Sequence, residues 1–280
     1  ISQVKIALPS NTEQEKAVVF LDSETSKLQQ IIDLKHNQIE LLREHEKSLI
    51  HNAVTKGLDP KAKMKDSGVE WIGNIPESWK LKRIKEVSYV KGRIGWQGLT
   101  TEEYKDAGPF LVTGTDFSNG SINWDSCYHV DEERWAEDPY IQLKNGDLLI
   151  TKDGTIGKIA VVKNLVSKAT LNSGIFVVRS TTKENNPDYL YWILNSTIFT
   201  EWIDYIKTGS TINHLYQEKF VDFRFPNPPH EIQIVISTYL NKEIAKLHQA
   251  INTIETQITK LEEYQKSLIY EVVTGKVKVS

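Results

Sequence analysis

The two ends of this sequence carry one segment twice, and this repeat constrains the fold more than any other feature. Residues 9–56 recur in diverged form at 228–275, with a constant offset of 219 positions, as from Leu21 to Leu240. Under this offset the run Lys47-Ser48-Leu49-Ile50 falls on Lys266-Ser267-Leu268-Ile269. Because identity, order and spacing agree, we expect the same structural unit at both ends of the chain.

Each copy of the repeat predicts one long helix, because apolar residues recur every seven positions and neither Pro nor Gly interrupts the run. In the first copy the recurring residues are Leu21, Leu28, Leu42 and Leu49, with Lys35 interrupting the series. In the second copy they are Leu240, Leu247, Ile254, Leu261 and Leu268 in one row and Ile244, Ile251, Ile258 and Val272 in the other, with Gln265 as the polar exception. We expect the two helices to pair as an antiparallel coiled coil, although the pattern alone fits helices that dimerise equally well.

Between the helices the sequence pattern changes to one that predicts a mixed α/β domain, so we expect the fold class α+β. Short β-branched runs such as 148–151 and 159–162 alternate with glycine-containing turns, and Asn186-Pro187 predicts the start of an internal helix. We divide the chain into residues 1–12, a first helix at 13–56, a linker at 57–70, a central domain at 71–226, and a second helix with a tail at 227–280.

Composition excludes several classes of protein. No run of eighteen uncharged apolar residues occurs, and the first residues lack the features of a signal peptide, so we expect a soluble, cytoplasmic protein. Cys127 is the sole cysteine, which leaves no internal disulfide and fits a small, inert side chain in a reducing compartment. The net charge of −3 argues mildly against nucleic-acid binding, so the local placement of charge has to decide.

Three segments of the central domain combine glycine, a base and a polar or aromatic side chain: residues 91–98, 152–158 and 208–214. Glycine lets a backbone approach a phosphate closely, while Lys, Arg, Gln and Asn can contact phosphates or base edges. Any one of these segments taken alone is more typical of a turn that needs positive φ. Together they make DNA the ligand that the sequence favours.

Other chemistries fit less well. Gly154-Thr155-Ile156-Gly157-Lys158 has too few residues between its glycines for a phosphate loop. Asn227-Pro228-Pro229-His230 is similar to an amino-methyltransferase tetrapeptide, but His230 replaces the aromatic residue and no glycine-rich cofactor loop precedes it. The histidines are scattered and suggest neither a metal site nor a catalytic set.

Three longer motifs carry a family resemblance. They are Ser67 to Trp79 (SGVEWIGNIPESW), Asn145 to Lys158 (NGDLLITKDGTIGK), and Gln265 to Lys276 (QKSLIYEVVTGK). With the two long helices, they resemble the S (specificity) subunit of type I restriction-modification enzymes over essentially the whole chain. The resemblance implies a non-catalytic subunit whose recognition domains each read one half of a bipartite DNA site, while the helices fix their separation.

The resemblance also implies partners. M subunits bound to the helices would methylate adenine N6 with S-adenosylmethionine, and R subunits would add ATP- and Mg-dependent restriction, so this chain itself is expected to bind no cofactor and no metal. Full-length S subunits have two recognition domains and only 71–226 is complete here, so residues 1–12 would be the remnant of a preceding one. Whether the chain acts as a monomer or as a homodimer stays open.

The side chains expected to contact DNA are polar residues of the glycine-containing segments and one neighbouring turn. They are Lys91, Arg93, Gln97, Thr115, Lys152, Lys158, Asn213 and His214. The main alternative is a coiled-coil protein-interaction module that never binds DNA, which the acidic balance favours. An affinity for DNA that falls with salt would exclude that alternative. A fused methyltransferase-nuclease is disfavoured because the cofactor loop and an intact catalytic tetrapeptide are missing.

Overall fold

The structure, a computed structural model, describes residues 9–93, 99–182, 184–207 and 214–279. It forms two compact units. The first combines residues 1–46 with 242–280, and the second spans residues 47–241. The second unit therefore includes the end of the first long helix and the start of the second, in addition to the central domain.

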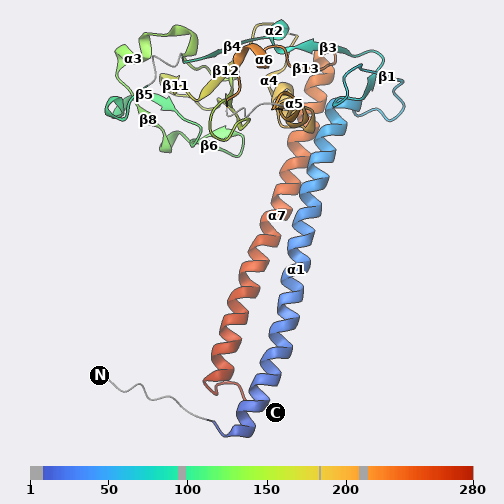
Figure 1. The fold of residues 1–280 in the computed structure, drawn as a ribbon, viewed down its shortest axis with the longest axis vertical. Coiled ribbons are helices and arrows are strands. Elements are labelled where there is room, and N and C mark those ends of the chain that lie inside the picture. The colour runs from blue at the N-terminus through green and yellow to red at the C-terminus, as the bar shows by residue number, and fades with distance from the viewer. Residues whose placement is uncertain (1–8, 94–98, 183, 208–213, 280) are drawn as a thin grey trace. The chain divides into compact units, whose positions relative to one another are not determined.

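The first unit contains the larger part of two long helices, α1 (Asn11–Lys56) and α7 (His230–Val273), which lie side by side within this unit (Figure 1). Their apolar side chains meet in two buried clusters. One cluster contains Ile32, Ile39, Ile251, Ile254 and Ile258, and the other contains Leu28, Leu268 and Val272. Burial of this apolar surface stabilises the contact by roughly 25 cal/mol per Å².

Polar side chains also form contacts between the two helices. The Nζ atom of Lys35 donates a hydrogen bond to Oε1 of Gln257 at 2.6 Å, and Nε2 of His248 lies 3.0 Å from Oε1 of Glu46. As residue numbers rise along α1, those of the partners on α7 fall. Lys35, which interrupts the expected apolar series, is accommodated because its ammonium group reaches a polar partner.

The buried face of α1 differs in part from the expected one. Ile32 and Ile39 are buried, yet they lie outside the row of every seventh residue that starts at Leu21. A helix with 3.6 residues per turn presents a second row three or four positions further along, and these two isoleucines occupy it. On α7, by contrast, residues of both expected rows are buried, as Ile254 and Ile258 show.

The second unit contains the strands and the short helices. Its strands are β1 (Met64–Asp66), β2 (Asn74–Pro76), β3 (Lys80–Arg83), β4 (Ser88–Gly92), β5 (Lys105–Val112), β6 (Phe117–Ser118), β7 (Ser121–Ile122), β8 (Tyr128–His129), β9 (Leu148–Thr151), β10 (Ile159–Val161), β11 (Ala169–Leu171), β12 (Ile175–Ser180) and β13 (Arg224–Asn227). Its helices are α2 (Ile84–Val87), α3 (Glu132–Ala136), α4 (Pro187–Leu194), α5 (Thr197–Lys207) and α6 (Gln217–Phe220), with 3-10 turns at Thr101–Glu103, Trp124–Ser126 and Pro139–Ile141. The predicted mixed α/β character of this region is confirmed.

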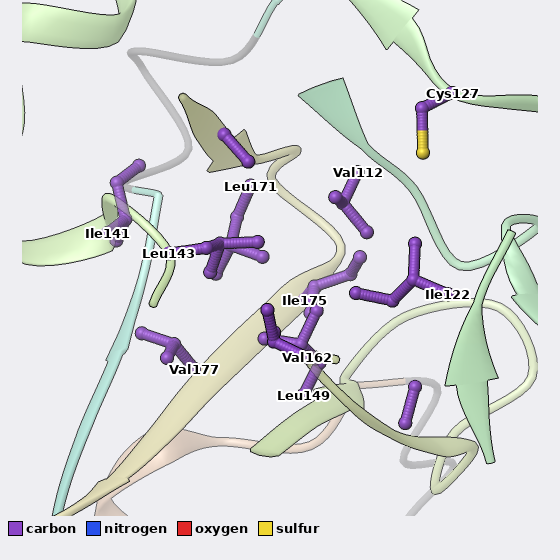
Figure 2. Close-up of a cluster of buried hydrophobic side chains, with 12 residues drawn as sticks. Val112, Ile122, Cys127, Ile141, Leu143, Leu149, Val162, Leu171, Ile175 and Val177 are labelled. Atoms are coloured by element: carbon purple, nitrogen blue, oxygen red, sulfur yellow. The ribbon is translucent and has the colours of Figure 1, made fainter. Parts of the chain in front are cut away.

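Two sheets enclose the core of the central domain. The larger has the order β10-β9-β12-β4 with antiparallel neighbours, and the smaller has the order β11-β5-β8 with β11 parallel to β5. Figure 2 shows the core, where Leu149 and Val177 of the larger sheet gather with Val112 and Leu171 of the smaller one. Strands β9 and β12 lie inside the larger sheet, which explains why Leu148–Thr151 is buried throughout.

Helix α4 begins where the sequence predicts it. Asn186 is the N-cap, its Oδ1 accepts a hydrogen bond from the Tyr189 backbone N–H at 3.0 Å, and Pro187 occupies the first turn. The fully buried hydroxyl of Tyr189 donates to the carbonyl oxygens of Pro226 at 3.0 Å and Val54 at 3.3 Å. These bonds help to explain why the end of α1 belongs to the same unit as the central domain.

The repeat recurs at the level of single hydrogen bonds. Nε2 of Gln14 donates to the carbonyl oxygen of Pro9 at 2.8 Å, and Nε2 of Gln233, 219 positions later, donates to the carbonyl oxygen of Pro228 at 2.9 Å. The same residue pair therefore fixes the chain entering each long helix.

The region predicted as a linker, 57–70, differs from the expectation because it contains β1, which pairs with β2.

A buried ion pair joins β12 to the turn before β9. Arg179 donates from Nε to Oδ1 of Asp147 at 2.7 Å, and from an η nitrogen to Oδ2 at 2.8 Å and to the carbonyl oxygen of Gln142 at 2.7 Å. The Asp147 carboxylate also accepts from the backbone N–H of Lys144 at 2.7 Å. These bonds to the carboxylate raise the pKa of Arg179. Asp147 of the motif 145–158 is therefore a structural residue.

Replacing Asp147 with Ala should destabilise the central domain by about 3 kcal/mol, because it leaves a largely buried guanidinium group without its partner. Urea unfolding followed by intrinsic tryptophan fluorescence measures the change. Asp131→Ala, which breaks the exposed pair with Lys105, is the matched control and should cost about 0.5 kcal/mol. Equal effects of the two substitutions would contradict the structural role of Asp147.

Candidate nucleic-acid interface

The loop at residues 152–158 is closed by the last residue of β9. Thr151, 3% exposed, donates from Oγ1 to the carbonyl oxygen of Thr155 at 2.5 Å and accepts from the backbone N–H of Lys158 at 3.0 Å. The backbone N–H of Thr151 donates to the carbonyl oxygen of Lys158 at 3.0 Å, and that of Gly157 donates to the carbonyl oxygen of Thr151 at 3.0 Å. Thr151 thus fixes the middle of the loop through its side chain and the end of the loop through its side chain and its backbone.

The two glycines of this loop have left-handed backbone conformations. Gly154 has φ 65° and Gly157 has φ 87°, backbone conformations that residues other than glycine rarely adopt. No atom lies within 4 Å of a Cβ placed on Gly154, so its backbone faces open space. The predicted glycine turn is therefore present, and its backbone can be approached closely.

Lys152 and Lys158 stand at the two ends of the loop. The Lys158 side chain is exposed. The ammonium group of Lys152 lies 5.0 Å from the centre of the Phe176 ring, and partial burial lowers the pKa of Lys152. A cation held over a ring has fewer accessible rotamers, so Lys152 is better ordered than a free surface lysine.

His214 is brought to the same loop by pairing with Asp153. The two residues form an isolated antiparallel bridge, and Nδ1 of His214 shares a hydrogen bond with the Asp153 carboxylate. The backbone N–H of Leu215 donates to the carbonyl oxygen of Lys152 at 2.8 Å. Tyr216, which is half exposed, lies edge-on against the imidazole with 4.9 Å between ring centres.

The turn containing Thr115 packs against Thr151. A Cβ on Gly114 would lie 2.9 Å from Cγ2 of Thr151, so the turn approaches as closely as glycine permits. Thr115 is exposed, and its hydroxyl lies 2.7 Å from that of Thr113. The buried Asp116 accepts from the Thr113 backbone N–H at 2.7 Å and holds the turn in place.

Lys91 and Arg93, the two predicted contacts among the described residues of the first glycine segment, differ in exposure. Lys91 is exposed on β4, opposite Val177 of β12. Arg93 is 1% exposed, and it donates from Nε to the carbonyl oxygen of Leu171 at 3.0 Å and from an η nitrogen to the hydroxyl of Thr170 at 3.2 Å. A guanidinium group this deeply buried has no free edge for a base, so the position of Arg93 gives no support to the predicted DNA contact and instead indicates that it links the end of β4 to β11.

Of the other predicted contacts, Gln97 and Asn213 lie outside the described residues. The structure therefore brings Thr115, Lys152, Lys158 and His214 around the end of β9. It leaves Lys91 on β4, which β12 separates from β9. Sequence reasoning missed Thr151, the hub of the cluster, and Tyr216, its exposed aromatic residue. The position of Thr151 at the end of a buried strand inside the motif 145–158 was the available signal.

The described residues offer little else for chemistry. They contain no group of three His, Cys, Asp or Glu side chains placed to hold a metal ion, and none of their helices has the length and apolarity to cross a bilayer. Burial raises the pKa of the Cys127 thiol to about 12, so this cysteine is protonated and unreactive at neutral pH. The arrangement around β9 presents cationic and hydrogen-bonding side chains, which suit the binding of an anionic ligand.

Comparison with known proteins points in the same direction. Residues 76–260 match the family described as the type I restriction modification DNA specificity domain. The type I restriction enzyme MjaVIII specificity subunit of Methanocaldococcus jannaschii is 24% identical over 282 residues, which cover 99% of this chain and 63% of that protein. The MjaIX specificity subunit of the same organism is 26% identical over 174 residues, covering 61% of this chain and 39% of that protein.

Solved structures share the fold. A chain from a structure of a type I R-M system superposes with a TM-score of 0.74 and 16% identity, over 97% of this chain and 62% of that chain. The HsdS subunit from Thermoanaerobacter tengcongensis gives a TM-score of 0.56 and 16% identity, over 97% of this chain and 60% of that one. The chain thus spans about three fifths of the length of several proteins that it resembles.

The role of Thr151 can be tested without DNA. Thr151→Val removes both hydroxyl bonds of the loop and should destabilise it by about 1–3 kcal/mol, because the Lys158 backbone N–H loses its acceptor. Hydrogen–deuterium exchange of peptides covering 152–158 should become faster. Thr151→Ser keeps the hydroxyl and is the matched control. Unchanged exchange in the valine variant would contradict the assignment of Thr151 as the hub.

Proposed function

This chain belongs to the family of type I restriction-modification specificity subunits, and we propose that it recognises one part of a DNA site and directs partner subunits to it. In this proposal the central domain reads the sequence, and M subunits carry out adenine-N6 methylation at the site. R subunits join for restriction. The chain itself performs no catalysis.

The observation that carries this proposal is the gathering of three separate segments around the end of β9. Lysines at 152 and 158 provide charge for phosphates, while Thr115 and His214 provide hydrogen-bonding groups for base edges. The exposed ring of Tyr216 adds a surface for apolar contact. Loops of this kind on a rigid sheet are a frequent basis for binding specificity.

The two long helices fit the role of a spacer that also docks partners. We propose that α1 and α7 pair as an antiparallel coiled coil, in support of which their contacts run in opposite residue order. Large apolar side chains remain exposed on both helices: Val18, Val19, Leu34 and Leu41 on α1, and Tyr264, Ile269 and Tyr270 on α7. Exposed apolar residues on a helix surface suit contact with another protein, here the M subunits.

The proposal places the cofactors elsewhere. S-adenosylmethionine would bind to the M subunits, and ATP and Mg to the R subunits. A second copy of this chain would supply a second recognition domain where a bipartite site is read. The competing function, a protein-interaction module without DNA binding, rests on the net charge of −3.

The test is co-expression with an M subunit from the same source, followed by sequencing that maps N6-methyladenine. We expect a defined motif to be methylated only when this chain is present. Lys152→Ala combined with Lys158→Ala should reduce methylation of that motif, because both lysines stand at the proposed DNA surface. Lys163→Ala, at the other end of the β9–β10 hairpin, should leave methylation unchanged. A stable complex that methylates no defined motif would favour the interaction module.

A further inference from the structure

A second basic surface lies on the two-stranded ribbon of β3 and β13, apart from the loops around β9. In its antiparallel register Arg83 stands directly opposite Arg224. Directly opposite side chains lie on the same face of a ladder, and like charges in such a pair destabilise it. The cross-strand pairing therefore gives no stabilising reason for two arginines directly opposite each other.

The segments that form the ribbon are rich in bases. Residues 80–87 and 222–227 contain Lys80, Lys82, Arg83, Lys85 and Arg224 against the two carboxylates Glu86 and Asp222. This excess of positive charge contrasts with the net charge of −3 of the whole chain. The negative charge is thus carried elsewhere, and the ribbon is a local basic surface.

Only some of these basic residues form ion pairs with the two carboxylates. Asp222 lies 2.6 Å from Nζ of Lys85 and 3.5 Å from an η nitrogen of Arg83, and Glu86 lies 3.3 Å from Nε of Arg83. Within the described part of the chain, Lys82 and Arg224 make no ion pair. Two cations on this surface are therefore available to an external anion.

The basic side chains border a hollow. Leu81, Lys82, Arg83, Glu86 and Arg224 line a cavity of about 350 Å³ that is open to solvent. This volume is large enough to admit a phosphate group, and the planar guanidinium groups of arginine can bind phosphate oxygens in pairs. Glu86, which also lines the hollow, is already bound to Arg83.

Buried side chains and hydrogen bonds fix the backbone of the ribbon within its unit. Phe223 and Phe225, on either side of the exposed Arg224, are fully buried, and the carbonyl oxygen of Pro226 accepts from the buried Tyr189 hydroxyl at 3.0 Å. The backbone N–H of Ile84 donates to the carbonyl oxygen of Phe223 at 3.2 Å. The backbone positions of the two arginines are therefore fixed before any ligand binds, which lowers the entropy lost on binding.

We propose that the Lys82, Arg83 and Arg224 surface binds the phosphodiester backbone of DNA, as a second contact that does not depend on sequence. The inference rests on the proposed function. Strand β4 connects this surface to the region around the end of β9. It begins directly after α2, next to the ribbon in sequence, and its last residue, Gly92, pairs with β12, which itself pairs with β9. Five strand residues span about 16 Å, which equals about five base pairs, so one duplex is long enough to reach both surfaces.

The test compares Lys82→Gln/Arg224→Gln, which removes the two cations without an ion pair among the described residues, with a control that loses the same charge, Lys260→Gln/Lys266→Gln on the exposed side of α7. Binding of the full chain to a random-sequence 30-base-pair duplex is measured by fluorescence anisotropy over a range of salt concentrations. We expect the slope of log K against log salt to fall by about 2 in the Lys82/Arg224 variant, with about 30-fold weaker binding at 0.15 M salt. The control should bind like the original chain, and Lys82→Arg/Arg224→Lys should retain the slope.

Each other outcome overturns the proposal in a distinguishable way. If the unsubstituted chain binds DNA with no salt dependence, the proposed function fails and the ribbon proposal fails with it. If the Lys82→Gln/Arg224→Gln variant binds like the control, only the ribbon proposal fails. If the variant binds DNA normally but no longer associates with the M subunit, the surface docks protein. Far-ultraviolet circular dichroism verifies folding, and a misfolded double variant is replaced by Arg224→Gln alone, which should lower the slope by about 1.

Discussion

The central domain depends on one buried amide at the start of α7. The side chain of Gln233 has no solvent exposure, yet it accepts from the backbone N–H of Asn186 at 2.8 Å and donates to the carbonyl oxygens of Glu184 and Pro228, each at 2.9 Å. A buried amide without partners would cost several kcal/mol, roughly 2–7 by transfer measurements, so all of these groups must be in place together. The N-cap of α4 and the entry into α7 are thereby fixed to each other.

The larger sheet of the same unit positions the surface that we propose to contact DNA. Strand β9 lies inside the larger sheet, and Thr151 at its end holds the loop 152–158, the turn before Asp116, and, through Asp153, the segment at His214. Loop residues contribute the exposed chemistry, while strand residues contribute the positions. Within one motif, the exposed Lys158 is therefore available for the proposed DNA contact, while the buried Asp147 stabilises the fold through Arg179.

Local patterns in the sequence were sufficient to predict the long helices, the start of α4 at Asn186-Pro187, and the buried strand at 148–151. Contacts between distant segments were not predictable in the same way. His214 meets Asp153 across 61 positions, and Arg93 turns inward because carbonyl and hydroxyl groups of β11 face it. A sequence shows that a residue is basic and follows a glycine, but only the fold decides whether its guanidinium group finds partners inside or outside.

The proposed function requires that the loop at the end of β9 face DNA. Photo-crosslinking measures this directly, with benzoylphenylalanine in place of Lys158 or, separately, Lys163, in a complex with the M subunit on a duplex carrying the methylated motif. We expect crosslinks from position 158 to bases of the motif and none from position 163, at the opposite end of the hairpin. Crosslinks from position 163 without any from position 158 would show that the loop does not face DNA.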